Sequence, residues 1–96
     1  MSILVEWEDD AIADLDRIID YIEVESPQGA LTIALAIRRG ANSLLSEFPK
    51  AGRQGRVPGT RELIVVGTPF IVVYVVDGER VEIIRVLHGR QQWPSN

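Results

Sequence analysis

The stretch Phe70-Ile71-Val72-Val73-Tyr74-Val75-Val76 is apolar at every position, and Asp77-Gly78 follows it directly. A continuous apolar run of this length is typical of a central strand that is covered on both faces of a sheet. The pair Asp77-Gly78 between two apolar runs is a strong signal for a tight hairpin turn. The sequence therefore predicts a central strand over 70–76 that turns back at once into another strand.

Further strands are predicted on both sides of this one. Arg80–His88 is rich in Val and Ile and forms the second arm of the hairpin, while Arg61–Val66 ends at the turn Gly67-Thr68-Pro69. Near the N-terminus, Ile3–Trp7 is apolar at nearly every position and predicts a short, well-covered strand. Strict alternation along the last strand would place on one face Val81, Ile83, Arg85 and Leu87.

Two helices are predicted between the first strand and the others. The first covers Ala11–Ile22, and Asp9 or Asp10 can cap its first turn. Its expected core stripe is Ile12, Leu15, Ile19 and Ile22. Ser26-Pro27 is a typical helix start, with serine as N-cap and proline at the first helical position, and this second helix runs to about Glu47. Its expected stripe is Ala30, Ile33, Ile37, Ala41, Leu44 and Phe48.

The order of these elements, β-α-α-β-β-β, predicts an α+β fold. Only a few residues separate the helices, so they should form an antiparallel hairpin. This hairpin would pack on one face of a small antiparallel sheet. A chain of 96 residues is the size of one domain, so we expect a single domain over residues 1–96.

Composition excludes several classes of chemistry. The chain has no cysteine and one histidine, so thiol catalysis and disulfides are ruled out and a zinc site is poorly supplied with ligands. Neither a Walker motif nor a dinucleotide-binding glycine motif occurs at a strand-to-helix junction. We therefore expect no metal and no cofactor. No segment is long and apolar enough to cross a bilayer, and no signal peptide is evident, which predicts a cytoplasmic protein without membrane contact.

Charge is distributed unevenly along the chain. Residues 1–25 hold nine acidic side chains against one arginine, a balance of −8, whereas residues 26–96 hold nine basic and five acidic side chains, a balance of +4. The two balances give the net charge of −4. We expect a solvated acidic helix, with Asp10, Asp14 and Glu23 on its polar face, and a separate surface that tolerates anions.

Candidate binding residues lie in the basic part of the chain. Arg53 and Arg56 belong to a Gly/Pro-rich loop, Lys50–Gly59, that either cradles a phosphate or is an ordinary solvated loop. Arg61 and Arg85 lie within apolar strands. Each must either reach an anion, with Glu62 or Glu82 as available partners, or open onto a binding surface.

The end of the last strand supplies three further candidates. His88 could act as a general acid or base, but it has no neighbouring nucleophile in the sequence and equally fits a hydrogen-bonded residue that closes the sheet. Trp93, together with Arg90, could stack on nucleic-acid bases. We favour the alternative that Trp93 is an aromatic anchor that holds the C-terminal tail on the domain.

The whole chain resembles the RelE/ParE family of bacterial toxins, and in particular its ParE branch. The motifs that carry the resemblance occur in the order expected for the family, and they are Asp14-Leu15, Tyr21-Ile22, the Pro49…Gly52-Arg53 loop, Gly59-Thr60-Arg61-Glu62-Leu63, Pro69…Tyr74 and Val86-Leu87-His88-Gly89-Arg90…Trp93-Pro94. The resemblance implies the toxin of a type II toxin–antitoxin pair. Its implied partner is a ParD-type antitoxin, whose C-terminal segment would place an amphipathic helix in an apolar groove of the toxin.

Two activities divide this family, and they imply different site residues. RelE-like toxins cleave mRNA on the ribosome, and the matching positions here would be Arg61, Arg85 and His88, with Arg53 as a phosphate clamp. ParE-like toxins poison DNA gyrase without known nuclease chemistry. The tail has Gln91, Gln92 and Trp93 where a ribonuclease would carry a tyrosine.

Net charge favours the gyrase activity. Docking onto ribosomal RNA requires many neutralised phosphates, and a chain with a pI of about 4.9 meets that requirement poorly. We therefore expect no catalytic residues and no sequence-specific nucleic-acid binding. The residues expected to contact gyrase or the antitoxin are Arg53, Arg56, Arg61, Arg85, Arg90 and Trp93.

Overall fold

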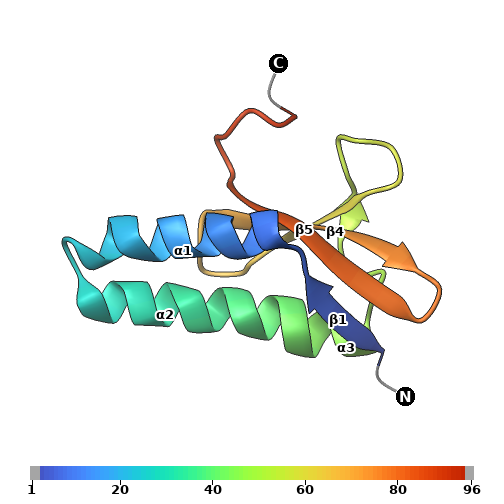
Figure 1. Cartoon of the computed structure of the whole chain (residues 1–96), viewed down its shortest axis with the longest axis horizontal. Helices are drawn as coiled ribbons and strands as arrows, with labels where there is room; N and C mark the ends of the chain where they lie inside the picture. The colour runs from blue at the N-terminus through green and yellow to red at the C-terminus, as the bar shows by residue number, and fades with distance from the viewer. Residues whose placement is uncertain (1–2, 95–96) are drawn as a thin grey trace.

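A computed structural model describes residues 3–94 and shows a helical hairpin beside a five-stranded sheet (Figure 1). The strands lie in the order β1-β5-β4-β3-β2. The elements, in chain order, are β1 Leu4–Trp7, α1 Asp9–Glu23, α2 Pro27–Arg38, a π-helical segment Arg39–Leu44, α3 Leu45–Glu47, β2 Arg53–Gln54, β3 Arg61–Ile64, β4 Phe70–Asp77 and β5 Arg80–His88. The α+β fold with its helical hairpin is confirmed.

The central hairpin of β4 and β5 provides most of the core. Val72 and Tyr74 of β4 are fully buried on the side that faces the helices, and Val73 is fully buried on the other side. Cover on both faces is the reason for the unbroken apolar run of β4. The turn lies one residue later than expected, because Asp77 pairs with Arg80 across the hairpin and leaves two residues in the turn. Gly78 takes the first of these positions with φ +61°, which suits a type II′ turn.

The sheet is mixed, whereas the sequence predicted an antiparallel one. β1 runs parallel to β5, and the hydrogen-bond register pairs Val5 with Val81 and Trp7 with Ile83. Parallel strands need a long connection, which the two helices and the remaining strands supply. β1 is also an edge strand with Leu4 57% exposed, so the expectation of a well-covered strand was wrong.

The predicted stripe of α1 is confirmed except at its first position. Leu15 is buried and Ile19 and Ile22 pack against the core, whereas Ile12 is 45% exposed and Ala11 is buried in its place. The predicted aspartate cap is also wrong. Glu8 occupies the N-cap position without a side-chain hydrogen bond, and the two aspartates lie inside the first turn, where they still favour the positive end of the helix dipole.

The second helix begins as predicted and continues to Glu47 through a π-helical segment. The Ser26 hydroxyl accepts a hydrogen bond from the backbone N–H of Gly29 at 2.9 Å, which confirms the N-cap. A π-helical turn contains more residues than an α-helical turn, so the side chains that follow it are rotated about the helix axis. Leu45 is consequently buried in place of Leu44, and Phe48 is 59% exposed.

A β-bulge in β5 overturns the predicted alternation. Val73 pairs with Arg85 but Tyr74 pairs with Ile83, so one extra residue is accommodated in β5. Beyond the bulge, Val86 joins Ile83 in the main core, and Leu87 faces the opposite side of the sheet. Arg85 lies at this bulge, and its side chain reaches Asp14 on α1.

Candidate functional site

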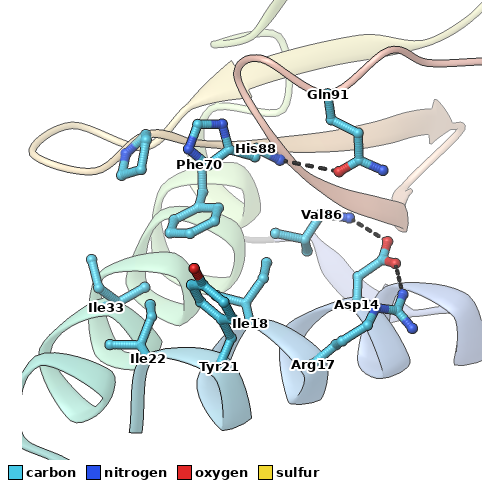
Figure 2. A pocket seen from close by; sticks show the side chains of 11 residues that line it. Asp14, Arg17, Ile18, Tyr21, Ile22, Ile33, Phe70, Val86, His88 and Gln91 are labelled. Carbon is cyan, nitrogen blue, oxygen red and sulfur yellow. Dashed lines mark hydrogen bonds and ion pairs between the residues drawn. The ribbon is translucent and has the colours of Figure 1, made fainter. Parts of the chain in front are cut away.

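An apolar groove of about 490 Å³ lies between the helical hairpin and the ends of β4 and β5. Figure 2 shows the helix side chains pointing toward those of the sheet across this groove. Its apolar lining comes from Ile18, Tyr21, Ile22, Ile33, Phe70 and Val86. Tyr21 is 82% exposed, so a large aromatic surface faces solvent at the rim of a hydrophobic hollow. Such a surface is typical of a protein interaction site.

A buried carboxylate closes one end of the groove. Asp14 is 4% exposed, and its Oδ2 accepts hydrogen bonds from Arg85 Nε at 2.6 Å and from the backbone N–H of Val86 at 2.9 Å. Its Oδ1 accepts from Arg17 at 2.7 Å. The hydrogen bonds that the Arg85 guanidinium donates to the Asp14 carboxylate raise the pKa of Arg85. This network joins α1 to β5 and satisfies the charge of each buried group.

The structure corrects two predictions about these residues. Asp14 was expected on a solvated helix face, but α1 packs this side against the sheet. Arg85 was expected either to pair with an anion, with Glu62 or Glu82 as available partners, or to open onto a binding surface. Its partner is Asp14, while Glu82 pairs with Arg80.

His88 lies at the rim of the same groove, at the end of β5. Its Nδ1 accepts a hydrogen bond from the backbone N–H of Arg90 at 3.1 Å, and its ring meets Phe70 edge to face at 5.6 Å between centroids. Trp93 packs on the opposite face of the sheet, against a cluster that includes Val73 and Leu87. The prediction that Trp93 anchors the tail is confirmed.

A second buried carboxylate organises the arginine loop. Glu62 is 1% exposed and accepts from the backbone N–H of Arg56 at 2.9 Å, from Arg56 Nε at 3.2 Å and from Arg53 Nη2 at 3.2 Å. Burial by itself would raise the pKa of Glu62, but the hydrogen bonds from Arg56 and Arg53 outweigh it and hold that pKa below its usual range. Arg56 also donates to the carbonyl of Gln91 at 3.3 Å, which ties the loop to the C-terminal tail.

Arg61 has no carboxylate partner among residues 3–94. Its guanidinium donates to the carbonyl of Gly52 at 2.7 Å, and the backbone N–H of Gly52 donates to the buried hydroxyl of Tyr74 at 2.8 Å. Burial raises the pKa of Tyr74, and the bond from Gly52 and the charge of Arg61 offset part of that rise. The loop is therefore bonded to the core rather than freely solvated.

The predicted site residues form two groups rather than one. Arg53, Arg56 and Arg61 surround Glu62 and the Gly52 backbone. In the other group, His88 borders the groove and Arg85 is bound to Asp14, which also lines it. Arg90 is exposed in the tail, which connects the two groups.

Sequence reasoning missed the central roles of Asp14 and Glu62. The burial of Glu62 could have been inferred, because it is a charged residue within an otherwise apolar strand, directly before Leu63. Asp14 gave no such signal, because it lies among many other acids of α1.

Neither a cluster of candidate metal ligands nor a membrane-spanning helix occurs within the described part of the chain. The described residues form an apolar groove and a basic loop that is held by a buried carboxylate. The helical hairpin on a mixed five-stranded sheet is the RelE/ParE-like fold.

Comparisons with known proteins place the chain within that class. The family model described as the ParE toxin of the type II toxin-antitoxin system parDE matches residues 5–93, so the chain belongs to the ParE toxin family. The protein named toxin RelE2 from Caulobacter vibrioides is 40% identical over 85 residues, covering 88% of this chain and 93% of that protein.

Two solved structures show the same fold. A chain from the chromosomal ParDE system of P. aeruginosa is 31% identical with a TM-score of 0.81, covering 91% of this chain and 96% of that one. A chain from the RelBE2 toxin-antitoxin complex of Mycobacterium tuberculosis is 25% identical with a TM-score of 0.69, covering 92% and 99%.

Proposed function

We propose that this toxin arrests bacterial growth by poisoning DNA gyrase and that a ParD-type antitoxin neutralises it. Membership of the ParE family carries the proposal. The positions and bonds of the three side chains that a ribonuclease would use also support it. Arg85 is bound to buried Asp14, Arg61 donates to a backbone carbonyl, and His88 borders a different hollow from Arg61. Two of the three groups are thus already engaged in the protein, and general acid–base cleavage would need them gathered around one phosphate.

The test of the gyrase proposal is an assay on supercoiled plasmid with purified gyrase, ATP and the antitoxin-free chain. Linear DNA should accumulate, because a trapped cleavage complex releases broken DNA when it is denatured. Prior addition of the antitoxin is the control and should prevent the linear product. Intact plasmid with normal supercoiling, from a chain that still binds its antitoxin, would contradict the proposal.

We propose the apolar groove as the binding site of the antitoxin's amphipathic helix. The groove offers aromatic and branched aliphatic side chains from both layers of the fold, and its rim carries the charged Asp14–Arg17 pair. Helix-in-groove recognition uses this combination of apolar anchors and polar rim. The solved P. aeruginosa neighbour comes from a system that contains both proteins, which agrees with such a partner.

The groove proposal is tested by replacing Tyr21 with alanine. Truncation of an exposed aromatic anchor should weaken antitoxin binding about 30-fold or more, as for interface hot spots. Phe48→Ala is the matched control, because Phe48 is also an exposed aromatic and does not line the groove. Equal antitoxin affinity for the two variants, measured by calorimetry, would place the antitoxin elsewhere.

Ribosome-dependent mRNA cleavage is the second candidate function. The names of the C. vibrioides relative and of the M. tuberculosis complex favour it, since both refer to RelE-type systems. It requires His88, which is exposed and hydrogen-bonded through Nδ1, as acid or base. His88→Ala should then abolish toxicity without loss of antitoxin binding. Retained toxicity of this variant would rule the activity out.

A further inference from the structure

We propose that the arginine loop, residues 50–61, contacts the phosphate backbone of duplex DNA when the toxin acts on gyrase. This inference rests on the proposed gyrase function and adds a DNA-facing surface to it. The observations that carry it are the charge of the loop, its exposure and its anchoring.

The loop is a local reversal of charge on an acidic protein. Residues 48–61 contain Lys50, Arg53, Arg56 and Arg61 and no carboxylate. The carboxylate that follows is Glu62, which is buried and shared by two of these arginines. The four cations and Glu62 give residues 48–62 a charge of +3, and the exposed Glu47 lies just before this segment.

Two of these cations face solvent although they are bonded to Glu62. The side chains of Arg53 and Arg56 are 57% and 37% exposed. Arg53 binds Glu62 through one terminal nitrogen, Nη2, so the other nitrogens of its guanidinium group are not used in that bond. Guanidinium groups match the geometry of phosphate oxygens, which makes a polyanion the natural partner.

The loop is held in one conformation before any partner arrives. The short strand β2 pairs with β3, the backbone N–H of Gly55 donates to the carbonyl of Thr60 at 2.8 Å, and Gly52 is bonded to Tyr74. Anchored cations lose less conformational entropy on binding than cations on a free loop. The hydrogen bonds therefore favour a binding surface over an ordinary solvated loop.

The C-terminal tail extends the same surface. The bond from Arg56 to the Gln91 carbonyl places the tail beside the loop, and in Figure 1 both project away from the helical hairpin. Residues 88–94 contain exposed Arg90 and no carboxylate, which brings the local charge to +4. Most of the exposed acids of the described residues lie within residues 6–25, in and beside α1, among them Asp9, Asp16 and Asp20, while Glu47, Asp77 and Glu79 are exposed elsewhere. Such a charge separation orients a protein on a polyanion, with the acidic helix directed away from it.

Duplex DNA fits this surface better than a single strand. Binders of single strands stack bases on exposed aromatic rings. The aromatic of the tail, Trp93, packs against a cluster that includes Val73 and Leu87 instead, and the exposed Phe48 precedes the arginine loop rather than belonging to it. Contacts to the phosphates alone are sequence-independent, in agreement with a target reached through gyrase.

The test compares the wild type with the double variant Lys50→Gln/Arg53→Gln in the gyrase cleavage assay at several salt concentrations. Both residues are exposed and lie outside the groove. The concentration of toxin that gives half-maximal linear DNA should rise about tenfold or more for the variant at low salt, and the gap should close as salt increases. The matched control is Arg38→Gln/Arg39→Gln, which removes two exposed positive charges from the second helix and should behave as wild type.

Direct binding to a fluorescent DNA duplex separates this inference from the gyrase proposal. The slope of log affinity against log salt should fall by about 2 for the loop variant and stay unchanged for the control. If the wild type binds the duplex but produces no linear plasmid in the gyrase assay, the gyrase proposal is contradicted and the DNA contact of the loop is not. Three results would overturn the inference: equal potency of all variants, loss of binding to gyrase in the absence of DNA, or tighter binding to single-stranded RNA than to the duplex.

Discussion

Asp14 and Glu62 show how single carboxylates organise this small protein. Each is almost fully buried, and each receives a backbone N–H and guanidinium groups. A buried charge without partners would shift its pKa or prevent folding, so these hydrogen bonds are a condition of the fold. One carboxylate joins α1 to β5, and the other joins the arginine loop to β3.

Replacement of Asp14 by asparagine should lower the free energy of unfolding by about 3 kcal/mol, because Arg85 would remain partly buried without its counter-charge. Urea unfolding at neutral pH measures this loss. Asp16→Asn is the control, since Asp16 is exposed on the same helix and should change stability by less than about 0.5 kcal/mol. Equal stability of the two variants would contradict the structural role of Asp14.

Glu62 should make stability depend on pH in the acid range. Its pKa is lower in the folded chain than in the unfolded chain, so the stability that it contributes is fully present above the unfolded pKa of about 4.3. That stability is lost as the pH falls through the lower, folded pKa. Thermal unfolding followed between about pH 6 and pH 2 should show a shallower decline for Glu62→Gln than for the wild type. Parallel declines would show that Glu62 keeps its ordinary pKa in the folded state.

At the scale of elements, the loop before β3 is tied to the core through a glycine. A Cβ on Gly52 would lie 2.7 Å from the hydroxyl oxygen of Tyr74 and 2.9 Å from the carbonyl oxygen of Glu62. Neither neighbour can move easily, because Tyr74 is fully buried and Glu62 lies in the strand that pairs with it. Close packing of loop and strand therefore requires glycine at this position.

Gly52→Ala should lower the free energy of unfolding by about 2 kcal/mol, as overpacking does in a rigid core. Gly40→Ala is the matched control, because a Cβ there meets its nearest side chain at 3.7 Å, an ordinary contact. Alanine in that helical segment should be neutral or stabilising. Chemical denaturation measures the free energy of unfolding of both variants, and the two changes should have opposite signs. A Gly52→Ala protein as stable as the wild type would contradict the prediction.

At the scale of the whole molecule, the fold separates an apolar groove from a basic loop. The groove opens between the helical hairpin and the ends of β4 and β5, while the arginine loop projects away from the hairpin (Figure 1). Gln91 of the tail borders the groove and its carbonyl accepts a hydrogen bond from Arg56 of the loop. One surface can thus engage an apolar helix while another faces a polyanion. An antitoxin long enough to cover both surfaces would block the target sterically as well as by occupying the groove.

Antitoxin binding should raise the melting temperature of the toxin in a concentration-dependent manner. A partner at 100 times its Kd adds about 2.7 kcal/mol, which for a domain of this size shifts the midpoint by roughly 10 °C or more. Scanning calorimetry at increasing antitoxin concentration measures the effect. A midpoint that stays constant across this range would mean that the folded chain binds no antitoxin.

Several elements were predictable because their signals are local. The apolar run 70–76, the Ser26-Pro27 helix start and the order of strands and helices follow from side-chain periodicity and capping chemistry, and all appear in the structure. The bulge in β5 and the π-helical segment were not predictable. Both shift a stripe of residues by one position, and neither is marked by a pattern in the sequence at the shift.

The sequence alone determined the α+β class, the two helices, the central hairpin and the basic character of residues 50–61. These features depend on residues within one or two turns or one strand, where steric preferences and hydrophobic periodicity act directly. Tertiary structure alone decided which charges are paired. Asp14 and Arg85 are 71 positions apart, and they meet because α1 packs on β5. Burial is set by the packing of whole elements, so the partner of a buried charge is chosen by the fold.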